Sequence, residues 1–197
     1  MSDARTLKIY GERFQDYASR FGREKPDADL QAFMDELPQA ARVLDLGCGP
    51  GHAAAFMAQA GLTVEAWDAT PAMVEMAGQT PGVAARLARF DDLDAEAHYD
   101  GIWANFSLLH APRADMPANL ARIARALKSQ GLFHLGLKAG EGERRDKIGR
   151  FYSYFGEDEL RDMLAEAGFE ITALRRGSST GLDGTTSPFI ILRARRT

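Results

Sequence analysis

Short apolar runs alternate with amphipathic stretches over most of the chain. The apolar runs have the length of strands and lie at residues 42–46, 62–67, 83–90, 99–104 and 132–137. Between them, apolar residues recur at helical spacing over about 51–60, after Thr70-Pro71, and over about 115–127. Strands separated by helices are typical of βαβ units. The pattern therefore predicts an α/β fold whose mostly parallel sheet is covered by helices on both faces.

The two ends of the chain depart from this alternation. Near the start, apolar and aromatic residues lie at mostly helical spacing over about 5–21, and a second helix is predicted over 27–37. Near the end, a helix over 157–167 precedes two strands, 169–174 and 188–193, with only a Gly/Ser/Thr-rich connection between them. We therefore expect a Rossmann-like, doubly wound, seven-stranded sheet, mostly parallel with an antiparallel C-terminal strand pair, in a single domain over 1–197.

Composition narrows the class of protein. With 197 residues, 45% hydrophobic and 26% charged, the chain is typical of one soluble globular domain. The formal net charge of −4 offers no basic excess for binding a nucleic-acid backbone. Cys48 is the only cysteine, which excludes an internal disulfide and a cysteine-based zinc cluster. No apolar run approaches the roughly 20 residues of a membrane span, and the charged start is unlike a signal peptide. We therefore expect a cytoplasmic protein with no membrane, nucleic-acid or metal partner.

The most informative segment is VLDLGCGPG, residues 43–51, in which a strand runs into three glycines at alternate positions before a helix. Glycine permits the sharp turn and lets a ligand lie against bare backbone, and the helix N-terminus offers unpaired N–H groups. The dinucleotide fingerprint G-x-G-x-x-G fails because His52 stands at its third glycine. The residues fit D-x-G-x-G-x-G instead, and no G-x-x-x-x-G-K-[ST] phosphate loop is present. An NAD-binding protein and a phosphate-loop protein are therefore disfavoured.

This segment resembles the first motif of the class I S-adenosylmethionine-dependent methyltransferases, and the resemblance extends from about residue 40 to the C-terminus. Within that family the chain looks like the small-molecule, UbiE/tellurite-resistance-like group. The resemblance implies S-adenosylmethionine as cofactor and S-adenosylhomocysteine as product. It also implies that the backbone of Gly47, Cys48 and Gly49 holds the amino-acid end of the cofactor, with Asp45 close by. A tight turn without a ligand is the alternative.

The end of the next strand extends the predicted cofactor site. Asp68 follows Gly51 by seventeen residues, and its carboxylate can accept both hydrogen bonds of a ribose diol. Capping of the following helix is the alternative for Asp68. The resemblance implies that Ala69 lies beside the cofactor and that Met73 packs near the adenine, with simple core packing as the alternative for Met73.

Two later segments complete that prediction. The resemblance implies that Asp91, with Asp92 as its competitor, binds the exocyclic amine of adenine and that Phe90 contacts the ring edge. A solvated acidic turn is the alternative. It also implies that Asn105 lies in a loop beside the sulfonium, facing the acceptor. That loop reads Asn-Phe-Ser-Leu and departs from the N-P-P-[FY] loop of nucleic-acid amino methyltransferases. DNA and RNA bases are therefore disfavoured as acceptors.

Few catalytic side chains are expected, because a sulfonium already activates the methyl group and positioning supplies most of the remaining catalysis. A general base is needed only where the acceptor must lose a proton. His110, just past the fourth strand, is the candidate for that role, because histidine titrates near neutrality. A structural histidine that orients the loop is the alternative.

The acceptor site is predicted from the variable parts of the chain. The resemblance implies that residues 1–38 form a helical lid over the site. Tyr10 and Tyr17 lie seven residues apart on roughly one helix face, so Tyr10 can contact the cofactor and Tyr17 the acceptor. Arg150, Tyr152 and Tyr154 follow the fifth strand and can form an acceptor pocket able to hold an anion. Lid packing for the first pair and a surface loop for the second group are the alternatives.

Together these features predict a methyltransferase that uses S-adenosylmethionine to methylate a small molecule by in-line transfer. The short chain leaves little length for a module that binds a macromolecule. A methyltransferase acting on a protein or RNA is one alternative, and it would need an exposed groove or basic stripe. A non-catalytic cofactor-binding or scaffold domain is another. The acceptor atom and the oligomeric state stay open.

Overall fold

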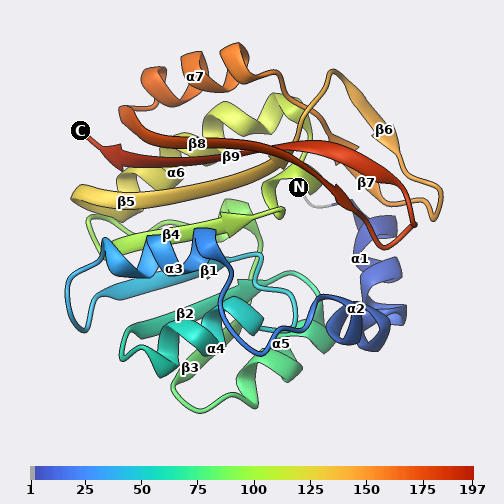
Figure 1. The fold of residues 1–197 in the computed structure, drawn as a ribbon, viewed down its shortest axis with the longest axis horizontal. Coiled ribbons are helices and arrows are strands. Elements are labelled where there is room, and N and C mark those ends of the chain that lie inside the picture. The colour runs from blue at the N-terminus through green and yellow to red at the C-terminus, as the bar shows by residue number, and fades with distance from the viewer. Residues whose placement is uncertain (1–2) are drawn as a thin grey trace.

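The computed structural model describes residues 3–197 and consists of a central sheet with helices on both faces (Figure 1). Its five parallel strands are β1 (Arg42–Leu46), β2 (Thr63–Asp68), β3 (Val83–Leu87), β4 (Tyr99–Asn105) and β5 (Leu127–Lys138). The hairpin of β8 (Phe169–Thr180) and β9 (Thr186–Arg196) completes the sheet, with β9 antiparallel to β5. The order β3-β2-β1-β4-β5-β9-β8 confirms the predicted seven-stranded Rossmann-like sheet and its antiparallel C-terminal pair.

Helices cover the two faces of this sheet (Figure 1). One face carries α3 (Ala28–Asp35), α4 (His52–Gln59) and α5 (Pro71–Gly78), and the other carries α6 (Met116–Ala126) and α7 (Glu157–Glu166). Alternate strand residues point to opposite faces. Val43 therefore joins the apolar cluster of Phe33 in α3, while the adjacent Leu44 joins the cluster of Leu120 and Leu160 from α6 and α7. Both faces of β1 are buried, so the turn that follows β1 starts from a firmly held strand.

The parallel strands end at a common edge of the sheet, on the right in Figure 1, where α1 (Ala4–Glu12) and α2 (Phe14–Phe21) lie. The short antiparallel pair β6 (Glu143–Arg145) and β7 (Phe151–Ser153) lies at the same edge. Single 3₁₀ turns follow β3 and β4, at Phe90–Asp92 and Leu108–His110, and a third lies at Arg113–Asp115. Ligands of open α/β sheets bind at the carboxyl ends of the strands, so this edge is the place to look for a site.

Two aspartates and a proline stabilise the starts of three helices. Asp27 accepts a hydrogen bond from the backbone N–H of Leu30 at 2.9 Å and caps α3. Asp3 caps α1 in the same way through the N–H of Thr6, also at 2.9 Å. Pro71 occupies the first position of α5, where its missing N–H costs no helical hydrogen bond.

The N-terminal prediction needs two corrections. The single helix expected over 5–21 is two helices, because Arg13 leaves the helical conformation with φ −117° and ψ 22°. Of the lid expected over 1–38, α3 belongs to the core, where Phe33 packs against Trp103 with ring centroids 5.2 Å apart. Only α1 and α2 cover the strand ends, and residues 1 and 2 lie outside the described part of the chain.

Two segments expected as turns or loops are strands. The Gly/Ser/Thr-rich stretch after residue 174 continues β8 to Thr180, so the hairpin extends well past the two short strands that the apolar pattern indicated. The run 141–145, whose composition gives no sign of a strand, contains β6, which is exposed to solvent and pairs with β7. In both places backbone pairing with a neighbouring strand supplies the order that local composition does not.

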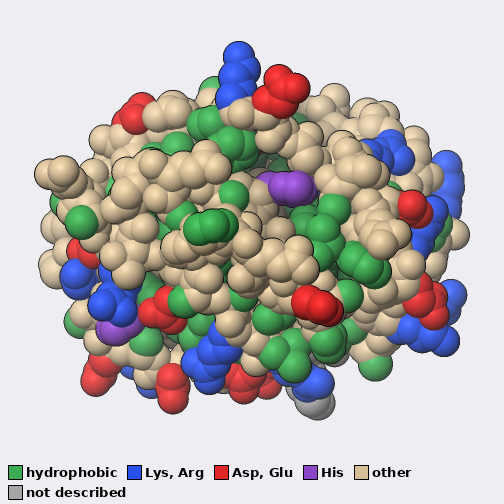
Figure 2. All heavy atoms as spheres, turned by 90° about the horizontal axis from the view of Figure 1, so that it is seen from below, with side chains coloured by type: hydrophobic (Ala, Val, Ile, Leu, Met, Phe, Trp, Pro, Cys, Tyr) green, Lys and Arg blue, Asp and Glu red, His purple; other side chains and the backbone are tan. Residues whose placement is uncertain are grey.

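The charge on the surface and the length of the helices are relevant to two partners that the sequence disfavours, nucleic acid and a membrane. Figure 2 shows the side on which α4, α5 and β3 lie, and there Lys and Arg side chains are interspersed with Asp and Glu. Among residues 3–197 no helix is both long enough and apolar enough to cross a bilayer.

Candidate functional site

The turn between β1 and α4 contains three glycines with positive φ, 81° at Gly47, 53° at Gly49 and 85° at Gly51. Packing requires two of them. A Cβ on Gly47 would overlap the side chain of Ser107, and a Cβ on Gly51 would lie 2.8 Å from the Cβ of Ala77. A Cβ on Gly49 would meet only one aromatic ring, at 3.6 Å. Gly49 is therefore the glycine of this turn that presents bare backbone to open space.

Two cavities open beside the glycine turn. The first contains about 700 Å³ of space, measured to its open mouth, and lies against β2, α5 and the turn after β3. The second contains about 1860 Å³, measured in the same way, and extends from the glycine turn to β5, β7 and the β8–β9 hairpin. Six residues line both cavities: Tyr10, Tyr17, Gly47, Gly49, Asn105 and Phe106. The two spaces therefore meet at the glycine turn and the end of β4.

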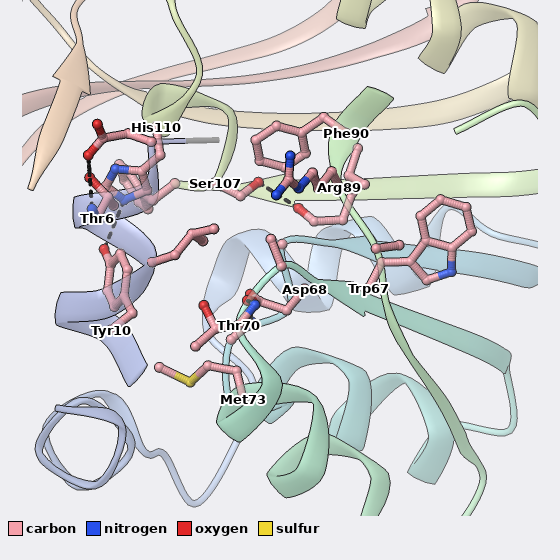
Figure 3. Close-up of a pocket in the computed structure, with 18 of the residues that line it drawn as sticks. Thr6, Tyr10, Trp67, Asp68, Thr70, Met73, Arg89, Phe90, Ser107 and His110 are labelled. Atoms are coloured by element: carbon pink, nitrogen blue, oxygen red, sulfur yellow. Dashed lines mark hydrogen bonds between the residues drawn. The ribbon is translucent and has the colours of Figure 1, made fainter. Parts of the chain in front are cut away.

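Asp68 lies at the end of β2 in the wall of the first cavity (Figure 3). Its two carboxylate oxygens accept hydrogen bonds from the backbone N–H groups of Gly49, at 3.0 Å, and Thr70, at 2.8 Å. Burial raises the pKa of Asp68, and these two hydrogen bonds oppose that rise by favouring the charged form. A carboxylate oxygen accepts more than one hydrogen bond, so Asp68 can hold the glycine turn and still bind a ribose diol.

Asp45 lies in the wall of the second cavity and is only 3% exposed. Its Oδ2 atom has no hydrogen-bond partner among the described residues. Burial raises its pKa to about 7, the backbone N–H of Ala54 opposes that rise, and the charge of Asp68 adds to it. A buried carboxylate oxygen without a partner is costly. An ammonium group would pair with it, so Asp45 fits the amino-acid end of the cofactor that the motif implies.

Of the residues that were predicted to lie near the adenine, some line the first cavity and others do not. Ala69, Met73 and Phe90 line the first cavity, where Figure 3 shows Met73 and Phe90 on different sides of Asp68. Asp91 is exposed and does not line either cavity. Its competitor Asp92 accepts a hydrogen bond from the N–H of Arg89 at 2.8 Å and so caps the 3₁₀ turn. Asp91 therefore lies outside the cavity that suits the adenine in this structure, and its contact with the cofactor stays a prediction.

The end of β4 lies where the cavities meet. Asn105 lines both, and its Oδ1 atom accepts a hydrogen bond from Nε2 of the buried His134 at 3.1 Å. Phe106 follows with φ 55°, a left-handed conformation that is uncommon for a bulky residue. Its ring packs edge-on against Phe189 of β9, with centroids 5.7 Å apart. Strain of this kind is found where surrounding structure holds a residue at a ligand site.

His110 takes part in a chain of hydrogen bonds that joins α1 to the body. Its Nδ1 atom lies 2.7 Å from the carbonyl oxygen of Phe151, which can only accept, so Nδ1 carries the proton. Its Nε2 atom then accepts from the hydroxyl of Tyr10, at 2.8 Å. Tyr10 in turn accepts from the Arg150 guanidinium at 2.9 Å. Burial lowers the pKa of His110 to about 4. His110 is therefore neutral at pH 7, with both nitrogens engaged, and its role as a base stays a prediction.

The predicted acceptor residues divide into two groups. Tyr17, Arg150 and Tyr152 line the second cavity, and the Arg150 guanidinium forms an ion pair with Asp146 at 2.7 Å, both side chains being almost fully buried. Tyr154 does not line either cavity, because its ring lies under the Arg144 guanidinium, 3.5 Å from the ring centroid. The contact of Tyr154 with the acceptor likewise stays a prediction.

Cys48 lines the second cavity and is buried, which raises the pKa of its thiol and keeps it protonated. Its side chain donates to the carbonyl oxygen of Gly49 at 3.3 Å. Its backbone N–H donates to Trp67 in β2 at 2.9 Å. Cys48 thus belongs to the turn that frames the cavity, and its thiol has no nucleophilic character.

Several lining residues escaped the sequence analysis. Thr6 from α1 and Thr70 and Arg89 from the βα turns line the first cavity (Figure 3). Lys138 and Arg175 line the second. One signal was available for Lys138, since it closes β5 at the carboxyl edge of the sheet, where Asp68 closes β2. Arg175 lies on a strand that the apolar pattern ended too early, so no signal marked it.

The sequence of this chain also matches a known protein family. A family model described as a methyltransferase domain matches residues 17–174, which is most of the chain. The chain belongs to this methyltransferase-domain family. Membership, together with the sheet order and the glycine turn, makes it a class I, S-adenosylmethionine-dependent methyltransferase domain.

Curated relatives of this methyltransferase domain are longer. It is 34% identical over 128 residues to a trans-aconitate 2-methyltransferase of Deinococcus radiodurans, a match that spans 64% of the chain and 48% of the relative. A trans-aconitate 2-methyltransferase of Streptomyces avermitilis is 36% identical over 100 residues, and 37% of that relative is spanned. The chain thus matches half or less of the length of these relatives.

A solved structure covers the methyltransferase domain almost completely. It is the 1,6-didemethyltoxoflavin-N1-methyltransferase of Burkholderia thailandensis, with bound 1,6-didemethyltoxoflavin and S-adenosylhomocysteine. That structure superposes with a TM-score of 0.76 and 25% identity, over 98% of this chain and 88% of the other. A TehB-like methyltransferase of Corynebacterium glutamicum, 20% identical over 99% of this chain and 100% of its own, shares the fold with a TM-score of 0.71.

Proposed function

We propose that the chain transfers a methyl group from S-adenosylmethionine to a small-molecule acceptor by direct in-line displacement. The observation that carries this proposal is the meeting of two cavities at six shared residues, beside a turn that presents bare backbone at Gly49. A transferase of this kind needs two ligands in contact at one point and separated elsewhere. The first cavity suits the nucleoside part of the cofactor, the glycine-turn end of the second cavity, where Asp45 lies, suits its amino-acid end, and the rest of the second cavity suits the acceptor.

The chain's own residues account for cofactor binding. Asp45 would pair its unpartnered Oδ2 with the ammonium group, and Asp68 would accept the ribose hydroxyls. Met73 and Phe90 offer apolar surface to a purine ring. When bound, S-adenosylmethionine supplies a methyl group on a positively charged sulfur, and its transfer leaves S-adenosylhomocysteine. The residues that hold it thereby aim that methyl group at the shared end of the cavities.

The contribution to catalysis is positional. Well-oriented reacting groups gain large effective concentrations, up to roughly 7–11 kcal/mol of the barrier. Asn105, held by His134, and the strained Phe106 present a fixed surface at the junction. Tyr10 and Tyr17 of α1 and α2 close the same point from the other side. Exclusion of water there protects the activated methyl group from hydrolysis.

A general base is the second part of the proposal. His110 would accept a proton from the acceptor only through Tyr10, whose hydroxyl already donates to Nε2. Replacing His110 by Gln should then slow methyl transfer by roughly 10²–10⁴-fold, the usual contribution of a base, at saturating S-adenosylmethionine, so that any loss of cofactor affinity from the wall of the first cavity is separated from the loss of the base. A fall in thermal stability with an unchanged rate would instead assign His110 to holding α1 on the body.

A small acceptor is supported by three observations. The relatives are named for trans-aconitate and for a toxoflavin precursor, which are both small molecules. Acidic and basic side chains are interspersed on the face seen in Figure 2, so that face lacks the continuous positive surface that nucleic acid requires. The second cavity, with about 1860 Å³ measured to its open mouth, also has room for a small organic molecule.

Two measurements test the proposal in turn. Titration calorimetry should detect binding of S-adenosylhomocysteine and no binding of NAD. A panel of small acceptors should then be incubated with S-adenosylmethionine carrying a labelled methyl group, and at least one should acquire the label. Binding of NAD in place of S-adenosylhomocysteine would overturn the cofactor assignment. Label transferred to protein or RNA and not to small acceptors would overturn the acceptor class.

A further inference from the structure

Lys138 is the last residue of β5 and lies in the wall of the second cavity. Its side chain is only 9% exposed, yet it is not part of an apolar cluster. The Nζ atom lies 4.2 Å from the centroid of the Tyr152 ring. Above it is the tip of the β8–β9 hairpin, where a Cβ on Gly181 would lie 3.7 Å from Nζ. The lysine is thus enclosed between β7 and that hairpin, with its ammonium group at the cavity.

The other cations of this cavity have counter-ions. Arg150 forms an ion pair with Asp146, Arg23 with Asp27, and Arg175 with Asp29.

Lys138 differs from these arginines. Within residues 3–197 no carboxylate lies within 4.0 Å of its Nζ, and Asp183 acts on it only from a greater distance. Burial lowers the pKa of Lys138. The charges of Asp183 and Asp146 oppose that shift, and those of Arg150 and Arg144 add to it. Burying a cation without a counter-ion costs free energy of desolvation, and an anionic ligand would offset that cost.

We propose that Lys138 binds a carboxylate group of the methyl acceptor and thereby selects anionic small molecules. The inference rests on the proposed methyl transfer and goes further, because it names the chemical class of the acceptor. Arg150 is less suited to this role, since its charge is already neutralised by Asp146 and its guanidinium donates to Tyr10. A single ammonium beside aromatic walls suits a group with one negative charge. Ser179 lines the same cavity and its hydroxyl is a further candidate donor, whereas the hydroxyl of Thr180 already pairs with that of Thr186 at 2.9 Å.

The register of the sheet sets the size of that acceptor. Asn105, at the junction of the cavities, pairs with Gly136, two residues before Lys138 on β5. Two strand residues span roughly 7 Å. The Cα atoms of Gly136 and Lys138 are therefore about the length of a small organic acid apart. The acceptor's reacting atom would lie beside Asn105 and Phe106, and its carboxylate would lie at Lys138.

The test uses defined probes on the chain loaded with S-adenosylhomocysteine. Acetate, succinate, benzoate and trans-aconitate are titrated by calorimetry, each beside its neutral amide or methyl ester. At least one carboxylate should bind, and at least tenfold more tightly than its neutral partner. That preference should be lost in Lys138→Gln, largely kept in Lys138→Arg, and unchanged in Lys8→Gln, which alters an exposed lysine outside both cavities.

The possible failures are distinct. Carboxylates that bind no better than their neutral partners, or that bind Lys138→Gln as well as the wild type, overturn the assignment of Lys138. Failure of the wild type to bind S-adenosylhomocysteine would overturn the proposed function instead. An independent measurement covers a variant that folds poorly: Lys138→Met removes an uncompensated charge and should raise the melting temperature without ligand. A lower melting temperature would show that the ammonium group already has a partner.

Discussion

The cofactor half and the acceptor half of the site are built differently. Asp45, Gly49 and Asp68 of the cofactor half come from the ends of β1 and β2 and from the turn between β1 and α4. They are joined by short-range contacts such as the hydrogen bond from the Gly49 N–H to the Asp68 carboxylate, nineteen residues apart. The acceptor half depends on side chains far apart in the sequence: Tyr10 meets His110 across 100 residues and Arg150 across 140. Residues that lie close together in the sequence form a motif that can be recognised there. Side chains that come together from distant segments form no such motif, so the specificity of the acceptor half has to be read from the structure.

The largest effect should come from Gly49→Val. A branched side chain would fill the open space at the turn, and its positive φ should cost about 1–2 kcal/mol in the free energy of unfolding. We expect the affinity for S-adenosylhomocysteine to fall more than 100-fold while the chain stays folded, as measured by calorimetry and thermal melting. Gly61→Val is the matched control, because Gly61 also has positive φ but no neighbour within 4 Å and lines neither cavity. Equal loss of binding in both variants would mean that strain alone disables the cofactor half.

Asp45→Asn should separate stability from binding. The folded pKa of Asp45, about 7, lies above the ordinary value of 3.8, so Asp45 favours folding at low pH and that contribution is lost as pH rises from about 4 to 7. Without cofactor, the variant should therefore gain stability over the wild type across this range, by up to about 4 kcal/mol at about 1.4 kcal/mol per pH unit. Thermal melts at pH 4 to 8 measure it. The same variant should bind S-adenosylhomocysteine more weakly. A stability difference that is independent of pH would contradict the charge assigned to Asp45.

Asp68→Ala should weaken S-adenosylhomocysteine binding by roughly 1.5–3 kcal/mol, the usual value of a hydrogen bond to a charged group. Asp91→Ala is its partner experiment, because Asp91 was expected at the adenine and is exposed outside both cavities. We expect the affinity of Asp91→Ala to stay within twofold of the wild type by calorimetry. A loss as large as that of Asp68→Ala would mean that the turn after β3 closes onto the ligand when the cofactor binds.

Tyr10→Phe should have the smallest effect among the variants that line the cavities, and it should test the boundary between the halves. It removes the hydroxyl that joins Arg150 to His110, at a cost of about 0.5–1.5 kcal/mol in the free energy of unfolding. Since no bond to the βα turns is lost, S-adenosylhomocysteine affinity should change less than in Asp68→Ala. If it falls further than in Asp68→Ala, the lid belongs to the cofactor half and the division proposed here is wrong.

Much of the fold was accessible from the sequence. The apolar runs around Leu44 and Ile102 are buried on both faces, so their pattern is set by the sheet itself and predicted β1 and β4 closely. The extension of β8 to Thr180 was missed, because Ser and Thr residues there are ordered by pairing with β9 and not by burial. The break at Arg13 was missed although Gly11 lies two residues before it, because the helical spacing of the apolar residues continues on both sides of the break.

In the site, too, residues governed by local rules could be predicted from the sequence, and residues placed by distant segments could not. Asp45, Asp68 and the glycines could be predicted to lie together, because the ends of strands and the turns after them have recognisable sequence patterns. Lys138 was missed because only the hairpin, arriving from residues more than forty positions later, encloses it in a cavity wall. Asp91 and Tyr154 were expected by analogy or by proximity in sequence, and neither signal states which way a side chain points.

The contacts of the glycine turn have a consequence for evolution. Since Gly47 abuts Ser107 and Gly51 abuts Ala77, a larger residue at either partner would press on the turn even in a lineage that no longer used a cofactor. Across homologues, positions 47 and 107 should therefore co-vary, as should 51 and 77, whether or not the descendants remain enzymes. Position 49 is free of this coupling, so substitution there would be the earliest visible mark of a descendant that has abandoned methyl transfer.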